Sequence, residues 1–362
     1  MNDQKRKALI EQWISPHVRA LSSYAVPDSS GLLKLDAMEN PYVWDDALQQ
    51  AWLKQLESAH VNRYPDPDAK ALKRQIKKVM QVPERLDLLF GNGSDELILL
   101  LALAVAAPGR SVLTFEPGFV MFRQIALMTQ LQFEAVSLTP DFELDLAATL
   151  AQIKSSQPAL IFIAQPNNPT GNLFGDSNIR KIIEAAPGLV VIDEAYTAFT
   201  DSDFMPLLDD YENLLIMRTL SKTGLAGLRL GFLIGDKHWL SELNKIRLPY
   251  NVGVLNQISA EFALQHYPVF EAQTASIRKA RTSVLVELKN IEGLHVWPSE
   301  ANFILVRTKA GQARLVFERL REHGVLIKCL DGAHPLLKDC LRVTIGTQEE
   351  NRQFIGTLKQ CL

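Results

Sequence analysis

One lysine lies in a loop of small and hydroxyl-bearing residues that follows a strand-like apolar run. The run 213–217 leads into the segment RTLSKTGLAGLR, which contains Thr219, Ser221, Lys222 and Arg229. Two hydroxyls and a guanidinium around one loop are typical of a phosphate site. A lysine that is desolvated beside another cation has a lowered pKa and can act as an amine nucleophile. The loop is therefore compatible with Schiff-base chemistry on a phosphorylated aldehyde, and also with an ordinary solvated lysine.

Two further polar motifs also follow apolar runs. The segment GNGSDE (91–96) exposes backbone N–H groups at the start of a predicted helix, which suits a phosphate. In QPNNPTG (165–171), Asn168 lies just beyond a buried strand, where its amide could donate to a ring oxygen of a bound molecule. Taken singly, the first motif is equally compatible with a tight turn and helix cap, and the second with an Asx turn.

The motif DEAY places an acid and a phenol directly after the apolar strand 189–192. Asp193 needs a cationic partner if it stays ionised there, because an unpaired buried carboxylate is costly. A protonated pyridine nitrogen would be such a partner, and Tyr196 could reach a hydroxyl on the same ring. A capping or metal-binding aspartate is the alternative for this motif alone.

The elements that must position these motifs alternate between strands and helices. Strands that are apolar throughout indicate a mainly parallel sheet covered by helices on both faces. In such sheets the ligand binds beyond the carboxyl ends of the strands, and each of the motifs lies just after a strand. The predicted fold class is therefore α/β with a mainly parallel sheet. We predict strands at 86–90, 111–115, 133–138, 159–164, 189–192, 214–217 and 229–234, and helices at 45–58, 69–80, 97–107, 119–129, 144–154 and 179–186.

A different pattern begins after Pro249. Helices at 251–264 and 267–290 precede a helix at 313–323 and short strands at 294–297, 303–306, 325–327 and 341–345. This order predicts a smaller α+β domain. We therefore divide the chain into an N-terminal segment (1–39) that packs with the small domain, a large domain (40–250) and a small C-terminal domain (251–362). The N-terminal segment is predicted to contain a helix over 5–21.

Composition narrows the class of protein. A chain of 362 residues is long enough for two domains, and 38 Lys and Arg against 41 Asp and Glu give a net charge of −3, with no sign of a nucleic-acid partner. The apolar run 97–108 is too short to cross a bilayer, and the N-terminus lacks the apolar region of a signal peptide, so we expect no membrane association. Cys329, Cys340 and Cys361 lack CxxC spacing, which favours a cytoplasmic protein without a metal site.

The motifs GNGSDE, NNPTG, DEAY and SKTGLAGLR, in this order, resemble those of the fold-type I pyridoxal-phosphate aminotransferases. Within that family the chain is most similar to the histidinol-phosphate aminotransferases. The segments MENPY, NRYPDP, ANFILVR and LRVTIGT also fit, so the resemblance covers nearly the whole chain. It implies pyridoxal 5'-phosphate as cofactor and a ping-pong transamination in histidine biosynthesis. That reaction converts L-histidinol phosphate and 2-oxoglutarate to imidazole-acetol phosphate and glutamate.

The resemblance implies a role for each matching residue. Lys222 would form the internal aldimine and then move the proton during catalysis. Asp193 would pair with the pyridinium nitrogen, so that the cofactor works as an electron sink. Asn168 and Tyr196 would hydrogen-bond the 3'-oxygen, and Phe119 would stack on the ring where much of the family has a tyrosine. The phosphate would be held by N–H groups of Ser94 and Asp95, the hydroxyls of Thr219 and Ser221, and Arg229.

Substrate recognition and assembly are implied in the same way. Arg342 would present a planar fork to a carboxylate or phosphate, Lys328 stands where several relatives have a second arginine, and Tyr24 would be an N-terminal substrate contact. Arg342 and Lys328 are also compatible with ordinary charges at a strand edge. Tyr64 would enter the site of the other subunit, which implies a homodimer with shared active sites. An aromatic amino-acid aminotransferase or a phospho-amino-acid decarboxylase of the same fold is the alternative function.

Overall fold

A seven-stranded sheet is the largest element of the computed structural model, which describes residues 3–23 and 26–362. The strand order is β2-β8-β7-β6-β5-β3-β4, and only β8 runs antiparallel to its neighbours in this sheet. The predicted mainly parallel α/β sheet is thereby confirmed. Its strands are β2 (Asp87–Asn92), β3 (Ser111–Glu116), β4 (Gln132–Ser137), β5 (Leu160–Ala164), β6 (Leu189–Asp193), β7 (Leu214–Thr219) and β8 (Leu230–Gly235).

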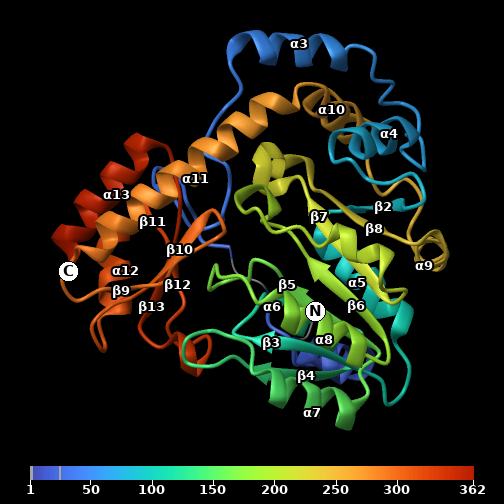
Figure 1. Ribbon diagram of the computed structural model, residues 1–362, viewed down its shortest axis with the longest axis horizontal. Helices are drawn as coiled ribbons and strands as arrows, with labels where there is room; N and C mark the ends of the chain where they lie inside the picture. Colours follow the sequence, from blue (N-terminus) through green and yellow to red (C-terminus); the bar gives the residue numbers. More distant parts are fainter. Residues whose placement is uncertain (1–2, 24–25) are drawn as a thin grey trace.

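Helices cover both faces of this sheet because its strands are apolar on both sides (Figure 1). In β6, Val190 and Ile192 lie in one core, whereas Val191 lies in the other. The first face carries α4 (Lys70–Val79), α7 (Leu146–Ser156), α8 (Asp176–Ala185) and α10 (Val254–Gln265). The second carries α5 (Ser94–Val105), α6 (Val120–Met128) and α9 (Lys237–Asn244), while α3 (Asp46–Leu56) packs on α10.

A four-stranded antiparallel sheet forms the core of the small domain, in the order β12-β13-β10-β9. The long helix α11 (Tyr267–Lys289) runs to this sheet from the helices of the large domain (Figure 1). Where the two domains divide remains a prediction. The elements of this part are β9 (His295–Val296), β10 (Phe303–Arg307), α12 (Ala313–Glu322), β11 (Val325–Leu326), β12 (Lys328–Cys329), β13 (Cys340–Thr344) and α13 (Gln348–Cys361).

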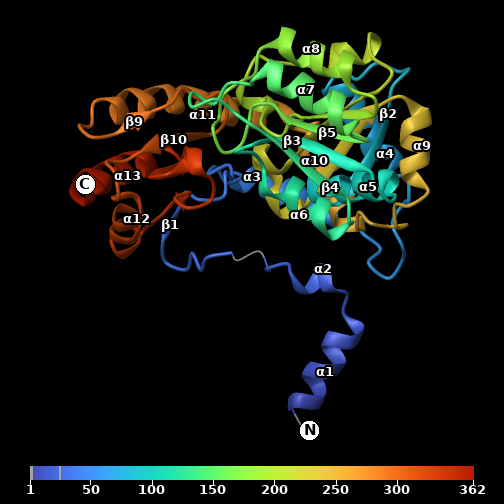
Figure 2. The same ribbon diagram turned by 90° about the horizontal axis from the view of Figure 1, so that it is seen from below.

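The N-terminal segment differs from the single helix predicted over 5–21. Two helices, α1 (Asp3–Trp13) and α2 (Pro16–Arg19), are separated at Ser15, because the ring of Pro16 is tolerated at a helix start but not in its interior. Figure 2 shows α1 extending away from the rest of the chain, and none of its residues is buried. Farther along, β1 (Leu33–Lys34) pairs in parallel with β11 of the small domain.

Helices α9 and α13 are elements for which no prediction was made from the sequence. For α13 a signal was present, since Thr347 and Glu350 form a capping box in which each side chain accepts the backbone N–H of the other. Of the helices in the described part of the chain, none is both long and apolar enough to cross a membrane.

Candidate active site

The motifs identified in the sequence meet in one pocket at the carboxyl ends of the large sheet's parallel strands. Turns after β2, β3, β5, β6 and β7 form its walls, and Arg229 reaches it from the start of β8. Every residue predicted to bind a cofactor lines this pocket, with the exception of Tyr64. The lining residues are Met38, Ser94, Asp95, Phe119, Ala164, Pro166, Asn168, Asp193, Ala195, Tyr196, Thr219, Ser221, Lys222 and Arg229.

Lys222 lies in a tight π-type turn, Ser221–Leu225, directly after β7. The turn closes because Thr223 Oγ1 donates to the Leu220 carbonyl oxygen (2.9 Å). The Lys222 ammonium donates to the Ala37 carbonyl oxygen (3.2 Å). Burial, followed by the positive charge of Arg342, lowers the pKa of Lys222 to about 8. A fraction of this lysine is therefore free amine near neutral pH, available as a nucleophile or base.

Asp193 is a buried acid at the end of β6, and 5 % of its surface is exposed. Among the described residues, the one hydrogen bond to its carboxylate comes from the Ala195 N–H (3.1 Å). Burial raises the pKa of Asp193 to about 7, although the positive charge of Lys222 acts in the opposite direction. A carboxylate in this position is suited to a ligand that brings its own cation.

Tyr196, Asn168 and Arg342 form a buried chain of hydrogen bonds. Asn168 Nδ2 donates to the Tyr196 hydroxyl (3.2 Å), and Arg342 Nη1 donates to Asn168 Oδ1 (2.5 Å). The Arg342 guanidinium also donates to the Asp36 carbonyl oxygen (3.0 Å) and lies over the Phe303 ring (5.3 Å). Burial raises the pKa of Tyr196, so its hydroxyl remains a donor throughout the physiological range. The structure thus joins three predicted site residues that are distant in sequence.

An anion cradle forms where α5 begins. Gly93 precedes the helix without a side-chain cap, so no side chain of the cap residue occupies the first N–H groups of α5, and the residues that begin this helix, Ser94 and Asp95, line the pocket. Gly93 adopts φ +81°, where an L side chain is strained, and a Cβ on it would lie 2.6 Å from Arg229 Nη2, so a larger residue would have to displace this guanidinium. Arg229 pairs with Asp95 at 3.1 Å, with both side chains about half exposed. Thr219 Oγ1 donates to Ser221 Oγ (3.0 Å), and these two hydroxyl-bearing residues also line the pocket.

Phe119 contributes an aromatic wall at the turn after β3. Its ring meets that of Phe122 edge-on, with centroids 5.5 Å apart, so its orientation is fixed by the core beneath it. A half-buried phenyl ring in this pocket can stack on a planar ligand but cannot donate a hydrogen bond to it.

Among the described residues, three that were predicted from the sequence, Arg342, Tyr64 and Lys328, are not part of the pocket's lining, although Arg342 donates to Asn168 in its wall. Tyr64 is 80 % exposed and stacks on Tyr250 with ring centroids 4.4 Å apart. Lys328 lies on β12 directly across the strand pair from Arg342. Tyr24, the predicted N-terminal substrate contact, lies outside the described residues. Within those residues, no group of three or more His, Cys, Asp and Glu side chains could hold a metal ion.

Two contacts to the lysine turn from the segment that follows β1 were not predicted from the sequence. Besides Ala37, Asn40 supports the turn, because its Nδ2 donates to the Thr223 carbonyl oxygen and to Gln273 Oε1 (both 2.9 Å). Met38 adds its side chain to the pocket lining. The proline after Asn40 marks this segment as a rigid loop, but its spatial partner is almost two hundred positions away and gives no local signal.

The family model for aminotransferase class I and II matches residues 30–358 of the chain. The chain belongs to this family. A protein of Nitrosococcus oceani named histidinol-phosphate aminotransferase 2 is 53% identical over 353 residues, which cover 98% of each chain. The histidinol-phosphate aminotransferase of Chromobacterium violaceum is 45% identical, over 98% of this chain and 99% of its own. The family resemblance inferred from the motifs is confirmed.

Solved structures show the same fold. The histidinol-phosphate aminotransferase of Sinorhizobium meliloti, solved in complex with pyridoxal 5'-phosphate, superposes with a TM-score of 0.86 at 23% identity and covers 96% of this aminotransferase. That alignment spans 97% of the Sinorhizobium chain. An L-threonine-O-3-phosphate decarboxylase of Porphyromonas gingivalis gives a TM-score of 0.75 at 22% identity, over 90% of this chain and 98% of its own. The fold alone therefore does not separate transamination from decarboxylation.

Proposed function

We propose that this aminotransferase binds pyridoxal 5'-phosphate and transfers the amino group of L-histidinol phosphate to 2-oxoglutarate. The observation that carries the proposal is the pocket itself, which combines a lysine of lowered pKa, a buried acid, a phenol–amide pair and an anion cradle. The relatives from Nitrosococcus oceani and Chromobacterium violaceum have histidinol-phosphate aminotransferase in their names and match over nearly full length. When bound, the cofactor supplies an electron sink for negative charge that develops on the substrate Cα.

The pocket fits this cofactor group by group. Asp193 would face the ring nitrogen, where a positive charge gives the buried carboxylate the partner it lacks among the described residues. The Asn168 amide and the Tyr196 hydroxyl would face the ring oxygen, and Phe119 would cover the ring. The phosphate would occupy the cradle formed by the N–H groups of Ser94 and Asp95, the hydroxyls of Thr219 and Ser221, and the Arg229 guanidinium.

Proton transfer at the substrate is assigned to Lys222. Its pKa of about 8 leaves a useful fraction of free amine near neutral pH, and Nζ can accept a proton from the substrate Cα and return it. Arg342 would bind the carboxylate of glutamate or 2-oxoglutarate, since its guanidinium already points toward Asn168 in the pocket wall. Lys328, across the strand pair, and Tyr24 are proposed as further substrate contacts.

The test is a titration of the purified, cofactor-loaded protein followed by visible absorbance. L-histidinol phosphate should bleach the cofactor band, and 2-oxoglutarate should restore it, with phenylalanine added in a parallel titration. A response to phenylalanine alone would indicate an aromatic amino-acid aminotransferase instead. Release of carbon dioxide from a phosphorylated amino acid would indicate a decarboxylase. Lys222→Ala should abolish both the band and turnover, whereas Lys245→Ala, at an exposed lysine paired with Glu242, should change neither. Turnover that persists in Lys222→Ala would contradict the mechanism.

We also propose that the active enzyme is a homodimer in which Tyr64 serves the site of the other subunit. The support is its position: Tyr64 is 80 % exposed on a rigid proline-containing loop and is absent from the lining of its own pocket. Refolding Lys222→Ala together with Tyr64→Ala tests this directly, since each mixed dimer would contain one site with both residues intact. Activity should reappear in the mixture, and a mixture as inactive as its components would contradict the shared site.

A cytoplasmic location is proposed on the basis of the thiols. Cys329, Cys340 and Cys361 are free, and the last two are buried, as is usual for a reducing compartment. Thiol labelling of the unfolded protein, taken directly from cell extracts, should find three reduced cysteines, and a disulfide would contradict this proposal.

A further inference from the structure

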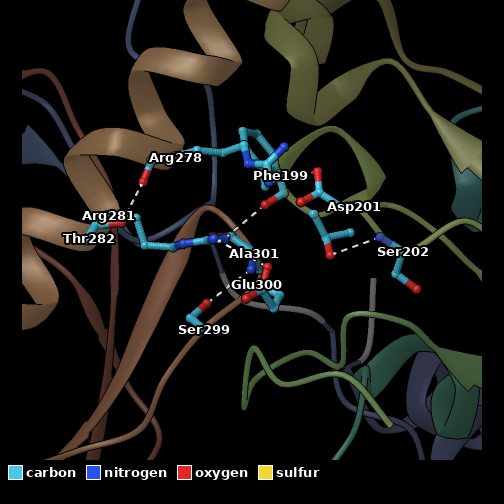
Figure 3. Close-up of polar contacts among 10 residues, drawn as sticks. Phe199, Asp201, Ser202, Arg278, Arg281, Thr282, Ser299, Glu300 and Ala301 are labelled. Atoms are coloured by element: carbon cyan, nitrogen blue, oxygen red, sulfur yellow. Dashed lines mark hydrogen bonds and ion pairs between the residues drawn. The ribbon is translucent and has the colours of Figure 1, made fainter. Parts of the chain in front are cut away.

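Arg281 is a buried cation at the junction between the two domains. It lies on α11, and only 8 % of its surface is exposed. Figure 3 shows its side chain extending from the helix between the loop that contains Phe199 and the loop that contains Ser299, Glu300 and Ala301. A guanidinium this deeply buried requires partners that compensate for the water it has lost.

The partners of Arg281 belong to segments that are a hundred residues apart in sequence. Its Nη1 donates to the Phe199 carbonyl oxygen (3.1 Å), beyond the DEAY motif, and to the Ala301 carbonyl oxygen (2.9 Å), just before β10. Its Nη2 approaches Glu300 Oε2 at 3.4 Å. One nitrogen therefore links the large domain's loop to the small domain's sheet through two buried carbonyl groups.

Both segments continue directly into the active site. On the large-domain side, the Phe199 N–H donates to the Tyr196 carbonyl oxygen (2.9 Å) within one 3-10 turn. On the small-domain side, Phe303 follows Ala301 by two residues, and its ring meets the Tyr196 ring edge-on with centroids 5.1 Å apart. A shift of either segment at Arg281 would therefore move the Tyr196 ring.

We infer that Arg281 is a positioning residue, which fixes the Tyr196 hydroxyl against Asn168 and the bound cofactor by holding Phe199 and Ala301 together. The inference rests on the proposed function, because the ring oxygen that Tyr196 would meet belongs to the cofactor. Loss of this alignment weakens the O–H donation from Tyr196. The anionic form of the ring oxygen is then less stabilised, so the pH at which the bound cofactor changes its absorbance rises.

The same helix provides a matched control. Arg278 lies one turn before Arg281 and pairs with Asp201 at 2.9 Å, but Asp201 is 90 % exposed at its side chain. Both arginines connect α11 to the loop after Tyr196, yet only Arg281 binds the two buried carbonyl groups (Figure 3). A general effect of charge or of helix packing would act at both positions.

The experiment follows the visible absorbance of the loaded protein as a function of pH. Arg281→Lys keeps the charge but loses the planar fork, so we expect the midpoint to rise by about half a pH unit or more, as for a weakened hydrogen bond. Arg278→Met should leave the midpoint unchanged. Tyr196→Phe gives the largest rise, and adding Arg281→Lys to it should produce no further shift, because the two residues act in series. Arg281→Gln, which retains an uncharged N–H donor, takes the place of the lysine variant if that variant does not fold.

Three results would overturn the inference: an unmoved midpoint in the Arg281 variants, an equal shift in Arg278→Met, or additive shifts in the double variant. The wild-type protein separates these failures from failure of the proposed function. If the wild-type protein has no visible band after addition of pyridoxal phosphate, the proposed function is wrong. If its band is normal, any of the three results above contradicts only the role of Arg281.

Discussion

Replacing Asp193 by asparagine should stabilise the cofactor-free protein while weakening cofactor binding. The carboxylate is buried at the end of β6, and its one hydrogen bond among the described residues comes from the Ala195 N–H, which an asparagine Oδ1 can also accept. The substitution therefore removes a titrating charge and leaves the shape and the local hydrogen bond in place. Residues selected for a ligand's charge are expected to be unfavourable when the ligand is absent.

The size of the stability gain in Asp193→Asn follows from the raised pKa of Asp193. In the unfolded chain this carboxyl titrates near 3.8, and in the folded protein near 7, so the folded state holds the proton more tightly. The free energy of unfolding therefore falls as pH rises between these two values and stays low above pH 7. Ionisation of the buried Asp193 lowers the free energy of unfolding by about 4 kcal/mol at high pH. This loss is larger at pH 7.5 than at pH 5 by about 2.5 kcal/mol. Asparagine carries no such penalty at either pH.

The assay is urea unfolding of the cofactor-free protein at pH 5 and pH 7.5, at one fixed protein concentration. The stability gained by Asp193→Asn should be larger at pH 7.5 than at pH 5 by about 2.5 kcal/mol. Asp141→Asn, at an exposed aspartate, serves as the control and should give the same small change at both pH values. With pyridoxal phosphate present the gain should be smaller, because the ring nitrogen loses its anionic partner and affinity falls by roughly tenfold or more, which corresponds to about 1.4 kcal/mol.

Two results would refute this reasoning. If Asp193→Asn changes stability equally at the two pH values, Asp193 does not titrate between them in the folded protein. If the variant binds pyridoxal phosphate as tightly as the wild type does, the carboxylate does not face a positive charge on the cofactor.

Three further predictions concern the pocket and the residues around it. Gly93→Ala should lower stability by about 1 kcal/mol, because an L side chain is strained at φ +81° and its Cβ would displace Arg229, so calorimetric titration should also show weaker cofactor binding. Arg218→Met should cost about 3–5 kcal/mol in urea unfolding, because it leaves the Glu194 carboxylate buried without the guanidinium that now lies 2.7 Å away. When pyridoxal phosphate is mixed with the cofactor-free protein by stopped flow, the rate of its reaction with Lys222 should rise with pH, with a midpoint near pH 8, where this lysine loses its proton. A midpoint near the pKa of a solvated lysine would contradict the lowered pKa of Lys222.

The order of the motifs was enough to predict the sheet and the face on which the site lies. Strands such as β5 are apolar at every position, so the local sequence alone indicates that both of their faces are buried. Because parallel strands end at one edge, residues such as Asn168, Asp193 and Lys222 had to converge there. Local pattern was less reliable at the N-terminus, where the predicted single helix is divided at Pro16.

By itself, the sequence thus determined the family, the α/β sheet and the chemical groups of the pocket, because strand periodicity and motif residues are local properties. Only the tertiary structure decided which distant segments hold those groups in place. Asn40 supports the lysine turn, Arg342 reaches Asn168 across 174 positions, and Arg281 joins two loops of different domains. Such contacts depend on how whole elements pack, and neither residue of a pair contains a local signal that identifies its partner.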